Sequence, residues 1–151
     1  MPLSRQARRN LTGLIALLAG SAVIVLGDKL LGVHIELWLG LATFSTAWAL
    51  DMFLVPFIAG FVVAVIFGLG GKWLCYFPPL IVRSVSYLVF AYFHDVPAGA
   101  DLLTFPFWIL FVILAVEAAA FGGVFGEIII KRTYGRMPRE LVYRRRSGNQ
   151  Q

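Results

Sequence analysis

The stretch KWLCYFPPLIVRSVSYLVFAYF, residues 72–93, is central to the fold because it places one arginine, Arg83, inside an otherwise lipid-like run. Two prolines, Pro78 and Pro79, stand shortly before that arginine. A charged side chain within an apolar span is costly, and such residues are usually paired with other polar groups. The depth of Arg83 and the identity of its partner are therefore the first questions that the sequence raises.

Composition assigns the chain to the membrane class. Of 151 residues, 60% are apolar and 14% are charged, and the mean hydropathy is +0.83. Soluble domains carry about 25% charged residues. Whole stretches of about 20 residues also lack the polar face that a soluble helix needs. The sequence therefore predicts an all-α integral membrane protein.

Four membrane-spanning helices are predicted, at residues 11–27, 52–70, 80–96 and 105–130. Ten of the thirteen Lys and Arg residues lie in the first nine positions or after Ile130. Because basic segments stay in the cytoplasm, both termini are expected there, and the number of spans is even.

The charge pattern divides the chain into three parts. These are a basic cytoplasmic N-terminus (1–10), a four-span membrane domain (11–130) and a basic cytoplasmic tail (131–151). Such a pattern is typical of a multi-pass protein of the bacterial inner membrane.

Residues 36–50 leave two alternatives open. The apolar run 37–50 has 14 residues, fewer than the roughly 17 needed to cross a bilayer. We therefore predict an interfacial or re-entrant helix in addition to the four spans, with Trp38 and Trp48 at the level of the lipid headgroups. The alternative is one tilted helix over residues 37–70.

Two helix starts are possible around Arg83, and each predicts a different partner. If the helix begins at Pro79, a position that suits proline, Arg83 lies about 6 Å from the start and reaches the inner headgroups beside Glu127. If the helix begins at Trp73, Arg83 lies at mid-bilayer, at the depth of Glu117. We favour the first start, and hence the pair Arg83–Glu127.

Glu117 and Asp51 complete the set of predicted intramembrane polar residues, with Arg83 and Glu127. In FVILAVEAAAFGG, Glu117 has no basic residue within one helical turn. An ionised carboxylate at mid-bilayer is costly unless it is paired or protonated. We expect Glu117 to face protein, as a contact with another chain, as a structural hydrogen bond, or as a proton or cation site.

Small residues recur at four-residue intervals in three of the predicted spans. Such rows let membrane helices approach closely. The predicted packing residues are Ala16, Gly20, Gly60, Ala64, Gly68, Ala118, Gly122 and Gly126.

A metal site is one possibility at the outer face, on the side away from the basic termini, although solvated loop residues explain the same pattern. Its candidate ligands are His34, Glu36, His94 and Asp95, because imidazole and carboxylate groups bind zinc, copper or iron. No phosphate-binding glycine loop and no nucleophile motif occurs, and the single cysteine, Cys75, cannot form a metal cage. The identity of any cofactor stays unknown.

The basic tail directly follows a predicted span, which favours anionic lipid headgroups over nucleic acid as its partner, at about 1 kcal/mol per basic residue. The residues concerned are Lys131, Arg132, Arg136, Arg139, Arg144, Arg145 and Arg146.

Three functions remain open from the sequence. The first is a small accessory or assembly subunit of a larger inner-membrane complex, bound to other membrane subunits or to copies of itself. The second is a small homo-oligomeric transporter or channel that uses Glu117 and Arg83. The third is a membrane enzyme or metal-handling protein with a site at the outer face.

Overall fold

The computed structural model of the protein describes residues 5–134. This part of the chain contains four helical segments that are long and apolar enough to cross a membrane. They are Gln6–Leu31, Thr46–Phe67, Gly71–Tyr92 and Phe105–Thr133. The prediction of an all-α fold with four such helices is confirmed.

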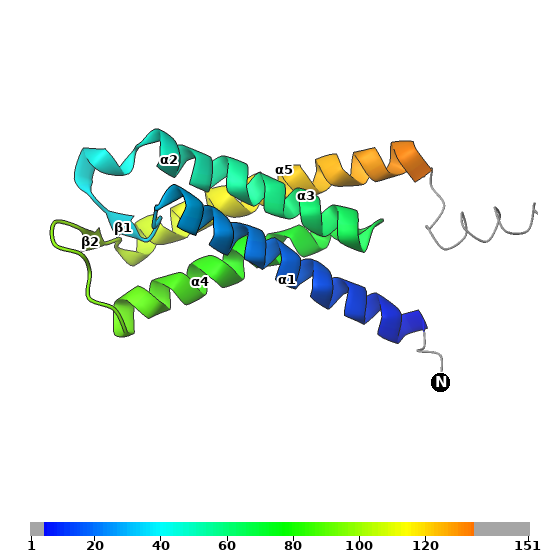
Figure 1. The fold of residues 1–151 in the computed structure, drawn as a ribbon, viewed down its shortest axis with the longest axis horizontal. Helices are drawn as coiled ribbons and strands as arrows, with labels where there is room; N and C mark the ends of the chain where they lie inside the picture. The colour runs from blue at the N-terminus through cyan, green and yellow to red at the C-terminus, as the bar shows by residue number, and fades with distance from the viewer. Residues whose placement is uncertain (1–4, 135–151) are drawn as a thin grey trace, which may run out of the picture.

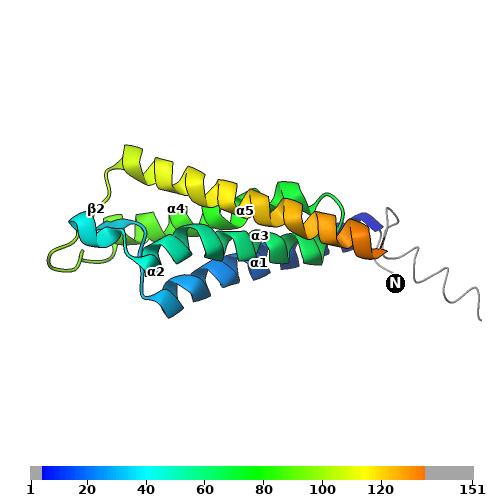
Figure 2. The same cartoon turned by 90° about the horizontal axis from the view of Figure 1, so that it is seen from above.

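The helices form a bundle in which consecutive spans run in opposite directions (Figures 1 and 2). Helix α1 (Arg5–Leu31) and helix α5 (Phe105–Tyr134) lie on opposite sides, and α3 (Val55–Phe67) and α4 (Phe77–Tyr92) each contact both of them. The start of α1, the end of α5 and the turn between α3 and α4 lie at one end of the bundle (Figure 1). The loops at 32–45 and 93–104 lie at the other.

The two ends of the bundle differ in charge. We call the first the basic end, since it carries Arg8, Arg9, Lys72, Lys131 and Arg132. We call the second the acidic end. Its loops and the adjoining helix termini carry Asp28, Glu36, Asp51, Asp95 and Asp101.

The second span begins earlier than predicted, and the separate helix expected at 36–50 is wrong. The chain instead forms strand β1 (Leu37–Trp38), a 3₁₀ turn (Gly40–Thr43) and helix α2 (Thr46–Ala49), which leads into the span. Ser45 caps α2 by accepting a hydrogen bond from the Trp48 N–H at 3.2 Å. Such a cap fixes the helix start at this point, and the alternative of one helix over 37–70 is wrong as well.

A π-helical turn, Leu50–Leu54, joins α2 to α3. Pro56 stands in the first turn of α3. In a regular α-helix its ring would clash with the carbonyl of Met52, four residues earlier. The wider π turn contains Met52 and removes that conflict.

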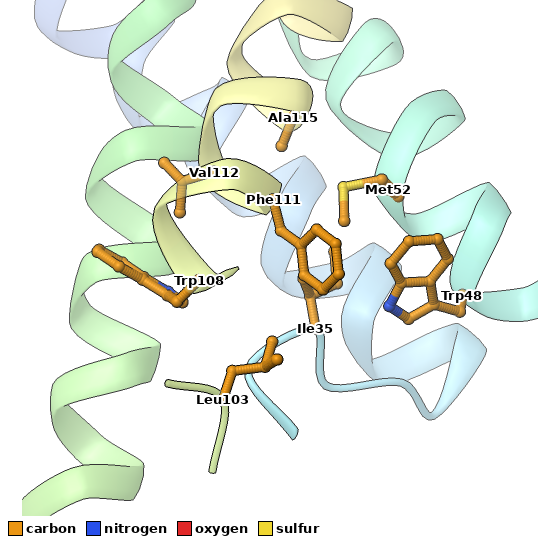
Figure 3. Close-up of a cluster of buried hydrophobic side chains, with 8 residues drawn as sticks. All are labelled: Ile35, Trp48, Met52, Leu103, Trp108, Phe111, Val112 and Ala115. Atoms are coloured by element: carbon orange, nitrogen blue, oxygen red, sulfur yellow. The ribbon is translucent and has the colours of Figure 1, made fainter. Parts of the chain in front are cut away.

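The acidic end is closed by contacts between its two loops. Strand β1 pairs antiparallel with β2 (Asp101–Leu102), with Leu37 opposite Leu102. The Leu103 N–H donates to the Glu36 carbonyl oxygen at 2.9 Å. Below this ladder lies the largest apolar cluster (Figure 3), composed of Ile35, Trp48, Met52, Leu103, Trp108, Phe111, Val112 and Ala115.

Trp48 belongs to that cluster, and its side chain is not the headgroup anchor predicted from the sequence. Its ring packs edge-on against Phe111 at 5.3 Å, and the residue is buried. Trp38, the other predicted anchor, is half-buried and contacts Phe44.

Helices α3 and α5 approach each other most closely at two glycines. A Cβ on Gly60 would collide with the carbonyl oxygen of Ala119, and one on Gly122 with that of Phe57. Gly126 lies against Ala64 in the same contact. Gly68 takes no part in it, because this residue ends α3 with a φ of 87° and an added Cβ would meet nothing.

The two predicted packing residues of α1, Ala16 and Gly20, are buried. Ala16 packs in a cluster with Val63, and Gly20 faces Val63 and Pro78. Ala118 of α5 is half-buried. The small residues thus lie mostly at helix contacts, with Gly68 as the exception.

Helix α4 begins at Phe77 and carries Pro78 and Pro79 in its first turn. This agrees with the favoured helix start to within two residues. The six residues before it form a 3₁₀ helix, Gly71–Tyr76, which continues the span toward the basic end. Its Cys75 is fully buried, and its one S–H lies within hydrogen-bond distance of two acceptors, the carbonyl oxygens of Gly60 and Gly71, at 3.2 and 3.1 Å.

Candidate functional site

Arg83 is the one charged residue of α4 (Phe77–Tyr92), and only 1% of its surface is exposed. From Gly71 to Arg83 the backbone rises about 21 Å, at 2.0 Å per residue in the 3₁₀ helix and 1.5 Å in the α-helix. From Arg83 to Tyr92 it rises only about 14 Å. Arg83 is therefore nearer the acidic end, and the prediction that it reaches the headgroups at the basic end is wrong.

Three carboxylates surround the Arg83 guanidinium. Asp28 accepts two hydrogen bonds, from Nη1 at 3.0 Å and from Nη2 at 2.9 Å. Asp51 accepts one from Nη2 at 3.1 Å. The Glu36 Oε1 atom lies 3.5 Å from Nη1, within ion-pair range but without a hydrogen bond. We call these four residues the ionic cluster.

Each member of the ionic cluster comes from a different element. Asp28 lies in the last turn of α1, one turn after the buried Ile24. Asp51 lies in the π turn. Glu36 stands between Ile35 and Leu37, both buried, in the loop at the acidic end. Arg83 therefore ties α4 to two other helical segments and to a loop.

The ionic cluster is nearly closed to solvent. The side chains of Glu36, Asp51 and Arg83 are 0–1% exposed, and only Asp28, at 12%, reaches the surface. Within the ionic cluster, four buried polar atoms lack a hydrogen-bond partner among the described residues: Glu36 Oε1, Glu36 Oε2, Asp51 Oδ1 and Arg83 Nε. Buried polar atoms are normally paired, so each unpaired one needs an explanation.

Charge balance adds to this. Three carboxylates and one guanidinium would leave two negative charges in excess if all were ionised. Burial raises the pKa of the Glu36 carboxyl above its ordinary value, and the nearby Arg83 only partly opposes the shift. Burial therefore favours the protonated form of Glu36.

Neither predicted partner contacts Arg83. Glu127 instead pairs with Lys131, one turn along α5, at 3.1 Å. Glu117 has no hydrogen bond and no ion pair within residues 5–134. Neither Glu127 nor Glu117 was the right partner because the 3₁₀ helix lengthens the span toward the basic end. Arg83 therefore lies closer to the carboxylates of the acidic end.

Glu117 lies at the middle of the apolar segment Phe105–Thr133 and is exposed on the surface of the bundle. Its neighbours at one-turn spacing, Ile113 and Phe121, are 51% and 69% exposed. In the isolated chain this face of α5 is therefore an apolar stripe with one carboxyl at its centre. Within one chain the expectation that Glu117 faces protein is not met.

The predicted metal ligands do not form a site. Glu36 belongs to the ionic cluster, while the His34 and His94 rings both pack against the Phe90 ring, with centroid distances of 5.1 and 6.1 Å. Asp95 is exposed. No group of three or more His, Cys, Asp or Glu side chains converges as metal ligands within residues 5–134.

Of the basic tail, Lys131 and Arg132 are exposed at the end of α5. The remaining predicted headgroup contacts lie outside the described residues: Arg136, Arg139, Arg144, Arg145 and Arg146.

No family model, no curated protein and no solved structure matches the chain. The function must therefore be argued from the ionic cluster, the Glu117 face and the charge of the two ends.

Proposed function

We propose that the protein is a small accessory or assembly subunit of a larger bacterial inner-membrane complex. It would bind through the face of α5 that carries Glu117, and another membrane-spanning chain would supply a hydrogen-bond donor or a basic side chain at that depth. The observation that carries the proposal is the exposed carboxyl at the middle of an apolar helix. Leaving it in lipid costs about 3 kcal/mol if it is ionised.

The surface around Glu117 suits a helix partner. Ile113 and Phe121 extend the exposed stripe by one turn in each direction. A partner helix packed along this stripe would remove the carboxyl from lipid and satisfy it with a hydrogen bond, as intramembrane polar residues generally require.

The charge of the two ends supports an orientation. Basic residues follow the last span and precede the first, and Lys72 lies in the turn on the same side. By the positive-inside rule the basic end is cytoplasmic, and so are both termini. The basic tail would then contact anionic headgroups of the cytoplasmic leaflet.

Site-specific photo-crosslinking tests the proposed interface. A photoreactive residue at Phe121 should give a defined adduct with an unlike membrane protein in intact membranes. The matched control is Leu18, 62% exposed on α1, which lies on the opposite side of the bundle (Figure 2). Adducts at both positions, or at neither, would contradict a specific α5 interface.

Substitution of Glu117 tests the role of the carboxyl. Glu117→Gln should keep the adduct at Phe121, since an amide keeps hydrogen-bonding capacity. Glu117→Leu should weaken the adduct and the co-purification of the partner. Unchanged co-purification of Glu117→Leu would show that the carboxyl is not the contact.

A homo-oligomeric transporter or channel is the second candidate. It is favoured by the ionic cluster, because buried carboxylates near an arginine are typical of proton and ion pathways. In that case the protein purifies as a single species of fixed size. Glu117→Gln then abolishes transport in liposomes and leaves the oligomer intact.

A further inference from the structure

The unpaired oxygens of Glu36 are the most unusual feature of the ionic cluster. Both belong to a fully buried residue and neither accepts a hydrogen bond, although Oε1 lies 3.5 Å from Arg83 Nη1. Asp28 occupies the Nη1–Nη2 edge of the Arg83 guanidinium, and the unpaired Nε N–H makes no hydrogen bond to Glu36. An ionised carboxylate left in this state is costly, whereas a protonated one carries no charge.

We propose that the ionic cluster is a proton-binding site in which the bound proton resides on Glu36. The site is independent of the Glu117 interface. A proton there removes one of the two excess negative charges and turns one Glu36 oxygen into a hydrogen-bond donor. An acceptor without a partner is present in the same ionic cluster, at Asp51 Oδ1.

The other acids of the ionic cluster are better compensated than Glu36. Asp28 makes a two-point contact with the guanidinium, the strongest form of such a pair. Asp51 retains one hydrogen bond from Nη2. Glu36 alone has only a longer contact at 3.5 Å. The proton is therefore held where the positive charge compensates least.

The charged and titratable groups that face Glu36 are few. Arg83 comes from α4, Asp28 from α1, Asp51 from the π turn, and His34 from the same loop. His34 is exposed, with its ring against Phe90. Asp28, whose side chain is partly exposed, provides the route by which a proton reaches the ionic cluster from water at the acidic end.

Infrared spectroscopy of the full-length protein in liposomes tests the proposal. Glu117→Gln serves as the background, because it removes a further carboxyl group that lies within an apolar helical segment. At about pH 7, well above the ordinary glutamate pKa of about 4.3, this background should show the carbonyl stretch of a protonated carboxyl. The band should vanish in Glu117→Gln/Glu36→Gln and persist in Glu117→Gln/Glu127→Gln.

Three results would overturn the proposal. One is the absence of the band in the Glu117→Gln background. A second is its loss in Glu117→Gln/Asp51→Asn with retention in Glu117→Gln/Glu36→Gln, which would place the proton on Asp51. The third is loss of the band on addition of sodium or potassium chloride at fixed pH, which would identify a metal-cation site instead.

Isotope labelling keeps the test decisive if a variant fails to fold. In the Glu117→Gln chain, ¹³C at glutamate carboxyl groups should shift the band to lower frequency, whereas ¹³C at aspartate carboxyl groups should leave it in place. A shift with aspartate labelling would contradict the assignment to Glu36.

Discussion

Arg83 is held by geometry that no other basic side chain reproduces. The guanidinium is planar and presents its donors as a fork, so that one edge binds Asp28 at two points while Nη2 also reaches Asp51. A lysine would be a single point charge with no such fork. At this residue the bundle therefore combines charge neutralisation with the alignment of three segments.

Removing the Arg83 charge should be strongly destabilising. Arg83→Met leaves three buried carboxylates without a cation, and breaking a buried ion pair by removing one partner costs about 3–5 kcal/mol. The measurement is the free energy of unfolding in detergent. Lys131→Met is the control, because its pair with Glu127 is half exposed and such helix pairs contribute about 0.3–0.5 kcal/mol. Equal losses in the two variants would refute the role of the ionic cluster.

Arg83 and Asp28 should also be energetically coupled. In Arg83→Met/Asp28→Met the most closely paired carboxylate is gone together with its cation, so the double variant should be less destabilised than the sum of the two single variants. A double-mutant cycle on unfolding free energies measures this coupling. The same cycle with Glu127 in place of Asp28 should be additive, since no contact joins Glu127 to Arg83.

The stability of the protein should depend on pH through Glu36. The pKa of this carboxyl is raised in the folded state, mainly by burial. The folded protein thus binds this proton more tightly than the unfolded chain, so the associated stability is present at low pH and is lost as pH rises through the folded value. Thermal unfolding in detergent should show a melting temperature that falls less with pH in Glu36→Gln than in the unchanged protein or in Glu127→Gln.

At the scale of elements, the contact between α3 and α5 depends on two glycines, because a residue with a side chain would not fit at either position. Each glycine faces a carbonyl oxygen of the opposite helix, Gly60 that of Ala119 and Gly122 that of Phe57. Backbones packed this closely gain dispersion and weak Cα–H···O contacts, which replace the hydrophobic effect in lipid.

Gly122→Ala should force these two helices apart. The new methyl group would overlap a backbone oxygen that cannot rotate away, and overpacking of this kind costs about 1–3 kcal/mol. The control is Gly13→Ala on α1, where the Cβ would lie 3.4 Å from the Phe67 ring. There alanine should be neutral or stabilising, through helix propensity. Unfolding free energies in detergent compare the two, and equal stability would contradict the close packing.

The four spans could be predicted at this scale from apolar length alone, and the small-residue rows indicated which helix faces pack. The start of the second span could not. It depends on the Ser45 cap and on the π turn that precedes Pro56, neither of which leaves a hydrophobic signal. The partners of Arg83 were missed for a related reason. The 3₁₀ helix Gly71–Tyr76 changes the depth of Arg83, and the loop residue Glu36 is brought to it only by the pairing of β1 with β2.

For the whole molecule, the separation of basic and acidic ends predicts the orientation in the membrane. Cysteines at Gln6 or Thr133, near the basic end, should resist a membrane-impermeant thiol reagent applied to intact cells. A cysteine at Ala98, exposed in the loop of the acidic end, should react. The native Cys75 is buried and should remain silent. Labelling of Thr133→Cys from outside would reverse the proposed topology.

The ionic cluster also constrains the order of events during synthesis. Asp28 precedes Arg83 by 55 residues and Asp51 precedes it by 32. A ribosome working at 5–20 residues per second needs about 3–11 s to cover the longer interval. During that time the first hairpin has its acids but not their counter-ion. Asp28 and Asp51 therefore have no counter-ion until α4 has been synthesised, and the closure of the bundle waits for the arrival of a single residue.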